Sequence, residues 1–203
     1  MNDGGYEAGY AACPCFWGDK PGSLIRKLCH LGRDLRGLRV IDAGCGEGKN
    51  AIALAQAGCF VHAVDCSAQA VSVGVRRFFH PGITWHVADM MRWNLAPERY
   101  DIVVAYGLLH CIPTSDGLMH LLARLQAATR PRGINVICAF DDGAHDLSAH
   151  PGFTPNLVAY KDYVSFYDGW RLIMASSSRL DETHPHNRIP HYHSLTRILA
   201  EKV

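Results

Sequence analysis

The stretch "VIDAGCGEGKNA", residues 40–51, decides the fold. A short apolar run enters a turn with glycines at 44, 46 and 48, and a helix-forming segment follows. Glycine lets a backbone approach a ligand with no side chain in the way. The stretch therefore predicts a strand, a ligand-binding turn and the start of a helix. Because the spacing is G-x-G-x-G and not the full G-x-G-x-x-G, the turn by itself does not identify the ligand.

On both sides of this turn, apolar runs of strand length alternate with helical patterns. Buried strands that alternate with helices indicate a parallel sheet covered on both faces, and the last two strands have no helix between them and should pair antiparallel. We therefore expect an α/β fold: a seven-stranded Rossmann-like sheet, helices on both faces and a C-terminal antiparallel β-hairpin. The expected strands are 38–44, 59–65, 83–89, 100–107, 134–140, 170–180 and 191–202, and the expected helices are 21–34, 48–58, 67–79, 115–130 and a short one in 160–167.

Composition limits the class of protein. A chain of 203 residues with 48% apolar residues is consistent with one globular domain. Its 20 basic and 19 acidic residues leave a formal charge of +1, which disfavours a nucleic-acid partner. The apolar runs are too short to span a bilayer, and the N-terminus lacks the features of a signal peptide. With eight scattered cysteines read as reduced thiols, these features predict a cytoplasmic location and no membrane partner.

Three acids stand at the ends of three successive predicted strands: Asp42, Asp65 and Asp89. Ligands of open α/β sheets bind at this edge. Asp65 is placed to accept hydrogen bonds from both hydroxyls of a ribose, and Asp89 from the amine of an adenine. Several acids close together would repel a pyrophosphate. The pattern therefore indicates a nucleoside ligand that carries no phosphate.

At this point the sequence resembles a known superfamily. "VIDAGCGEGKNA", "VHAVDCS", "VADM" and "YDIVVAYGLLHCIP" are similar to successive motifs of class I S-adenosylmethionine-dependent methyltransferases. The resemblance covers roughly residues 20–140 closely and is nearest to the tellurite-resistance-type and thiopurine-type small-molecule methyltransferases. It implies S-adenosyl-L-methionine as the cofactor.

The resemblance also implies a division of the single domain 1–203: an N-terminal cap or lid segment 1–34, a cofactor-binding core 35–140, and an acceptor-side loop with the C-terminal hairpin, 141–203. Tyr10 and Phe16 would join Trp17 as walls of the lid. The alternative is that these aromatic residues only cover the sheet edge. The implied cofactor-binding residues are Trp17, Asp42, Gly44, Cys45, Gly46, Asn50, Asp65, Cys66, Asp89, Met90 and Tyr106.

Candidate catalytic residues follow the fourth predicted strand. His110, in "GLLHCIP", is the first candidate for a general base because histidine titrates near neutrality. It could instead only shape the loop. Tyr106 could contact the acceptor or only pack against the cofactor. Candidate substrate contacts in the loop after the fifth strand are Asp141, His145 and His150.

The segment "THPHNRIPHYHS", residues 183–194, holds four histidines: 184, 186, 191 and 193. His191 and His193 are two apart on a strand and should project from the same face. Three interpretations stay open: a polar hairpin end, acceptor binding or base catalysis by His191 and His193, and ligation of a transition metal by His184, His186, His191 and His193.

The sequence thus predicts an enzyme that transfers a methyl group to a small molecule by in-line displacement. The acceptor would be a thiol, a chalcogen oxyanion, or an oxygen or nitrogen nucleophile of a specialised metabolite. The alternative is a cofactor-binding module, or a methyltransferase-fold protein that catalyses a non-methylating step. No exposed apolar stripe predicts an oligomeric state.

Overall fold

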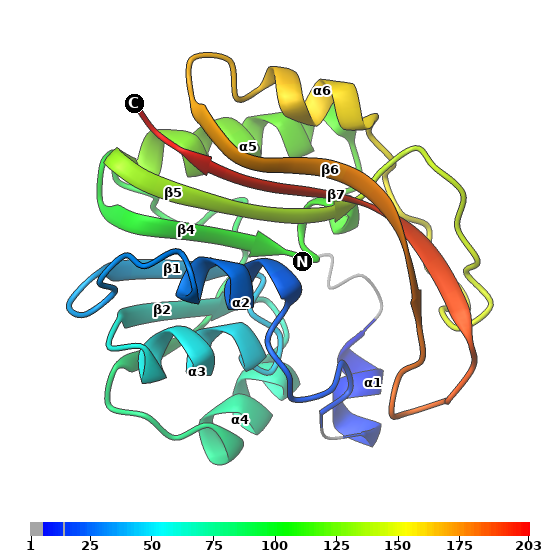
Figure 1. Cartoon of the computed structure of the whole chain (residues 1–203). Helices are drawn as coiled ribbons and strands as arrows, with labels where there is room; N and C mark the ends of the chain where they lie inside the picture. The colour runs from blue at the N-terminus through cyan, green and yellow to red at the C-terminus, as the bar shows by residue number, and fades with distance from the viewer. Residues whose placement is uncertain (1–5, 14) are drawn as a thin grey trace.

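The computed structural model describes residues 6–13 and 15–203 and contains one seven-stranded sheet (Figure 1). Its strand order is β3-β2-β1-β4-β5-β7-β6. Strands β1 to β5 pair in parallel, whereas β7 runs antiparallel to both β5 and β6. This confirms the expected sheet and C-terminal hairpin. Residues 1–5 of the expected lid segment lie outside the described residues, as does Pro14.

The elements follow the predicted alternation. The strands are β1 Arg39–Ala43, β2 Phe60–Asp65, β3 Ile83–Val87, β4 Tyr100–Tyr106, β5 Thr129–Phe140, β6 Arg171–Glu182 and β7 His191–Glu201. The helices are α1 Glu7–Ala12, α2 Ser23–Cys29, α3 Lys49–Gln56, α4 Ala68–Arg77, the 3₁₀ helix η1 Leu109–Cys111, α5 Ser115–Ala128 and α6 Tyr160–Ser165. None of these helices is long and apolar enough to cross a membrane.

Two apolar cores lie on the two faces of the sheet. Successive residues of a strand point to opposite faces, so Val40 of β1 enters one core and its neighbour Ile41 the other. Helices α2 and α3 pack over the first core, and α5 and α6 over the second (Figure 1). Cys59 and Cys138 are buried in the first core as reduced thiols, as their apolar sequence contexts predict.

The junction of α5 and β5 differs from the prediction. The helix expected over 115–130 ends at Ala128, and β5 begins at Thr129. Thr129 has an extended backbone and pairs with Tyr100 of β4, while its hydroxyl donates to the Leu125 carbonyl at 2.8 Å. Thr129 also accepts a hydrogen bond from the Asn135 amide at 2.6 Å. This buried threonine ends the helix before the proline on which the prediction relied.

The C-terminal hairpin is the longest pairing in the sheet. Its register runs from Arg171 opposite Glu201 to Glu182 opposite His191. The ends of β6 and β7 next to their connection curve away from the rest of the sheet and reach down beside α1 (Figure 1). The hairpin therefore brings the histidine-rich segment to the N-terminal part of the chain.

We predict that Gly74→Ala destabilises the protein. A Cβ atom at Gly74 of α4 would lie 2.5 Å from the indole of Trp85 and 2.9 Å from the Glu47 carbonyl oxygen. Overpacking of this kind costs about 1–3 kcal/mol, which urea unfolding would measure. Val75→Ala, on the exposed side of the same helix, should change the free energy of unfolding by less than about 0.5 kcal/mol. Equal stability of the two variants would contradict the close packing of α4 on β3.

Candidate active site

The glycine turn at the end of β1 has the backbone geometry that the sequence predicts. Gly44, Gly46 and Gly48 all have positive φ, at 68°, 54° and 85°. A Cβ atom at Gly48 would lie only 2.2 Å from the Trp85 ring. The turn is tied to the next strand because the backbone amides of Gly44 and Cys45 both donate to the Val64 carbonyl. Glycine is required here by conformation and by space.

The carboxylate of Asp65 holds this turn from the end of β2. It accepts hydrogen bonds from the backbone amides of Gly46, at 2.7 Å, and Ser67, at 2.8 Å. Burial raises the pKa of Asp65, and these backbone donors oppose that rise. Asp42 is also buried at the end of β1, where burial, and then the charge of Asp65, raises its pKa to about 7. The two acids are therefore close enough to influence each other.

A cavity opens beside the turn and collects most of the predicted cofactor-binding residues. Three predicted residues are absent from the cavity wall. Asp42 and Met90 are buried elsewhere, and the Asp89 carboxylate accepts from the Met91 backbone amide at 2.9 Å. The predicted residues that do line the cavity are Trp17, Gly44, Cys45, Gly46, Asn50, Asp65, Cys66 and Tyr106.

The N-terminal segment closes one side of the cavity. Tyr10 and Trp17 line it, and the Trp17 indole N–H donates to the Tyr10 hydroxyl at 2.8 Å. Lys49 of α3 donates to the Trp17 carbonyl at 2.9 Å, which fastens the segment to the helix after the glycine turn. Phe16 does not line this cavity; its ring stacks on His186 at 3.8 Å.

The start of helix α2 packs against two residues of the cavity wall, Asn50 and Tyr106. The Asn50 side chain accepts from the Gly22 backbone amide at 2.9 Å. A Cβ atom at Gly22 would lie 2.3 Å from the Tyr106 ring, so only glycine permits this approach. The contact holds the phenol of Tyr106 at the cavity wall, next to the Ser23 hydroxyl.

His110 lies in η1 and also lines the cavity. Its Nδ1 accepts a hydrogen bond from the Phe140 backbone amide at 3.1 Å, and its ring stacks on Phe140. The neutral ring therefore carries its proton on Nε2. Burial, followed by the nearby His193, lowers the pKa of His110 to about 3. In this tautomer His110 can donate a hydrogen bond from Nε2 but has no free lone pair with which to accept a proton.

The wall opposite the glycine turn comes from the acceptor-side segments. His150, in the loop after β5, lines the cavity together with Glu182 and His184 at the end of β6. His191 and His193 project from the same face of β7, as predicted. Both contact His150, and His191 also lies near Glu182. His186 lies apart from this group, against Phe16.

Two other predicted substrate contacts have structural partners. Asp141 is buried and accepts hydrogen bonds from the hydroxyls of Ser177 and Thr196 on the hairpin. His145 contacts His193 and the Asp141 carbonyl. Sequence reasoning missed several residues that line the cavity, although Glu47 and Lys49 lie within a quoted cofactor motif: Tyr6, Glu47, Lys49, Leu180 and Glu182.

Comparison with known proteins finds a family model that matches part of the chain lining this cavity. A family model described as a methyltransferase domain matches residues 40–133, from β1 through the beginning of β5. The matched segment contains the glycine turn, Asp65 and Tyr106. This match agrees with the resemblance of the sequence motifs to class I S-adenosylmethionine-dependent methyltransferases.

One curated relative is a methyltransferase. The chain is 40% identical over 85 residues to the magnesium-protoporphyrin O-methyltransferase of Rhodobacter capsulatus, a match that covers 40% of this chain and 37% of that protein. The chain spans half or less of the length of the first curated relatives that it matches.

Solved structures share the fold. One, from work on the conversion of a disulfide bond into a thioacetal group during echinomycin biosynthesis, has a TM-score of 0.72 and 23% identity, and covers 100% of this chain and 93% of that chain. Another is the magnesium protoporphyrin IX methyltransferase of Synechocystis with bound S-adenosylmethionine, with a TM-score of 0.67, 18% identity and coverage of 98% and 93%. The family match and the ligand of this neighbour support S-adenosylmethionine as the cofactor that the sequence motifs imply.

We predict that Asp65→Ala weakens binding of S-adenosylmethionine by about 2 kcal/mol, or roughly 30-fold, in calorimetric titration. The substitution removes a carboxylate that can accept charge-assisted hydrogen bonds and that also fixes the turn. Asp89→Ala, outside the cavity wall, is the matched control and should bind the cofactor more tightly than Asp65→Ala. Unchanged affinity in Asp65→Ala would refute a role for this carboxylate in binding.

We predict that burial of His110 makes the protein less stable in acid. The folded pKa of about 3 lies below the unfolded value near 6.5, so the unfolded chain binds more protons as the pH falls through 6.5. The contribution of His110 should fall by roughly 2 kcal/mol between pH 8 and pH 5. His110→Gln removes this titration, so urea unfolding should show a smaller loss in the variant. Parallel pH profiles for the two proteins would contradict the prediction.

Proposed function

We propose that this protein transfers the methyl group of S-adenosylmethionine to a heteroatom of a small-molecule acceptor. One observation carries the proposal. A single cavity joins Gly44 and Asp65, on the cofactor side, to Glu182 and His184 on the hairpin. Donor and acceptor can therefore meet inside one enclosure.

The cofactor half of the cavity supports an in-line transfer. The sulfonium group already activates the methyl carbon, so the protein mainly supplies proximity and alignment. Asp65 would hold the ribose hydroxyls, because each carboxylate oxygen keeps a lone pair beyond its bond to the backbone. The open backbone at Gly44 and Gly46 would lie against the methionine portion. Tyr6 and Trp17 would exclude water from the reacting atoms.

On the acceptor side, His110 would orient the acceptor and not deprotonate it. Its Nδ1 lone pair is occupied by the Phe140 amide, and its remaining N–H can donate to an acceptor oxygen or to its negative charge. Tyr106 would form the wall between the cofactor and the acceptor. The acceptor classes that suit this site are those with a soft or readily ionised nucleophile: a thiol, a chalcogen oxyanion, or an oxygen or nitrogen nucleophile.

Methyl transfer to a panel of acceptors tests the proposal. Protein incubated with methyl-labelled S-adenosylmethionine and thiols, selenite, tellurite, phenols or amines should label at least one class and release S-adenosylhomocysteine. Asp65→Ala should lower kcat/KM through weaker cofactor binding, whereas His186→Ala, outside this cavity, should react at the wild-type rate. Tight cofactor binding with no turnover across the panel would contradict a methyltransferase and favour a cofactor-binding module.

A further inference from the structure

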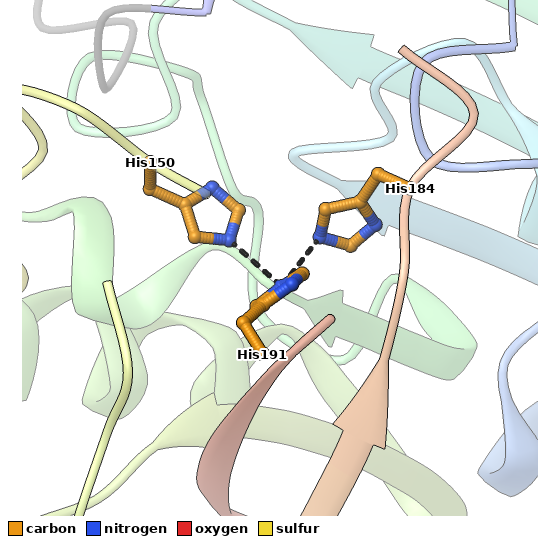
Figure 2. Close-up of side chains that lie close together, drawn as sticks. All are labelled: His150, His184 and His191. Carbon is orange, nitrogen blue, oxygen red and sulfur yellow. Dashed lines mark hydrogen bonds between the residues drawn. The ribbon is translucent and has the colours of Figure 1, made fainter. Parts of the chain in front are cut away.

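Four histidine side chains from three separate segments meet beside the cavity. His150 comes from the loop after β5, His184 follows β6, and His191 and His193 begin β7. The Nε2 atom of His191 lies 3.2 Å from that of His150 and 3.1 Å from that of His184, and Figure 2 shows the three rings converging on one point. The Nε2 atom of His193 is 3.2 Å from that of His150. The same ring atom of every residue is therefore directed inward.

These spacings match those of metal ligands. Imidazole nitrogens bind zinc at about 2.0–2.1 Å, which places neighbouring ligands of a tetrahedral site about 3.3 Å apart. A carboxylate completes the group. Glu182 Oε1 lies 4.0, 3.9 and 3.8 Å from the Nε2 atoms of His184, His191 and His193. The Glu182 side chain reaches this position because its strand register places it directly opposite His191.

The hydrogen bond on the far side of His191 fixes its tautomer. Its Nδ1 lies 2.8 Å from the Ile189 carbonyl oxygen, which can only accept, so Nδ1 carries the proton. The Nε2 atom of the neutral ring then presents a bare lone pair to the centre of the cluster. Metal-binding histidines characteristically donate their other ring N–H to a carbonyl or carboxylate in this way.

Contacts of His145 fix the tautomer of His193 in the same way. His145 Nε2 lies 2.8 Å from the Asp141 carbonyl oxygen and must donate to it. His145 Nδ1 is then an acceptor, and it faces Nδ1 of His193 at 3.4 Å, which must carry the proton of that ring. His193 Nε2 is therefore a second bare lone pair directed at the cluster.

The cluster has fewer protons than contacts. With His191 and His193 both unprotonated at Nε2, only His150 and His184 can supply a proton to the three N···N contacts. A cation would satisfy all of these lone pairs, because neutral imidazole is the form that binds metal.

We propose that His150, His184 and His191 ligate a divalent first-row transition metal, with His193 and Glu182 completing its coordination. The donor set of imidazole nitrogens and one carboxylate favours Zn²⁺, Fe²⁺, Co²⁺ or Ni²⁺ over Mg²⁺ and Ca²⁺, which prefer oxygen ligands. Both His150 and His184 line the same cavity as Asp65. The metal would therefore lie on the acceptor side of the methyltransferase cavity.

The role of the metal rests on the proposed function. An acceptor O–H or S–H that binds the ion would lose its proton to solvent, since coordination stabilises the anion. That oxygen or sulfur would take the methyl group as the carbon–sulfur bond of the cofactor breaks, which leaves S-adenosylhomocysteine. The inference narrows the acceptor to one whose reacting atom, or a neighbouring atom, is an anionic oxygen or sulfur ligand.

Metal binding can be tested without any methyl transfer. Tag-free protein, stripped with a chelator and titrated with Zn²⁺ in a calorimeter, should bind about one ion per chain. Co²⁺ should give visible absorption bands of a site with nitrogen ligands. His184→Ala should weaken Zn²⁺ binding by at least about tenfold, and His150→Ala should do the same. His186→Ala is the matched control in the same hairpin and should bind like the wild type, because its ring stacks on Phe16.

Circular dichroism of each variant establishes that it folds before its affinity is compared. Stoichiometric binding that His184→Ala and His150→Ala lose and His186→Ala keeps would support the site. No Zn²⁺ binding by the wild type, or equal binding by all three variants, would overturn it. Stripping the metal should also abolish methyl transfer while S-adenosylmethionine still binds; undiminished transfer by the stripped protein would overturn the acceptor role alone. Failure of every acceptor in the panel would contradict the proposed function without affecting the titration.

Discussion

The direction of the strands is the constraint on which the site depends. Strands β1, β2 and β4 run in parallel, so their carboxyl ends lie at one edge of the sheet. Because β7 is antiparallel to β5 and β6 is antiparallel to β7, the end of β6 and the start of β7 return to that same edge. The glycine turn and the histidine-rich segment, far apart in sequence, therefore share one cavity.

The core of the fold could be predicted because its signals are local. Buried strands and capped helices can be recognised from a few neighbouring residues, and the glycines at 44, 46 and 48 permit the positive φ angles that the turn adopts. The predicted end of helix α5 was wrong, because the true end depends on a contact with a residue far away in the sequence. Thr129 leaves the helix to pair with Tyr100, and its hydroxyl joins a buried network with Asn135 that no local pattern reveals.

The site could be predicted only in part, for a similar reason. Gly44, Cys45, Gly46 and Asp65 belong to turns at strand ends, and their positions follow from the alternation. His150 was expected in the acceptor region, but its contact with His191 depends on how a loop folds over 41 residues of separation. No local sequence pattern identified Glu182 as a site residue. Its place opposite His191 is set by the register of a hairpin that bends toward α1, and this bend has no signal in the sequence.

The acceptor-side residues lie on that hairpin, whereas the cofactor-side residues lie on β1 and β2. The two sets of residues can therefore change independently. Each strand residue adds about 3.3 Å, and the side-chain pattern repeats every two residues. Removing two residues from each strand near Glu182 and His191 would withdraw the tip by about 7 Å and keep every remaining side chain on its face. The glycine turn and Asp65, anchored in β1 and β2, would be untouched. Related chains could thus gain, lose or change their acceptor chemistry through the length of β6 and β7, while the cofactor site stays the same.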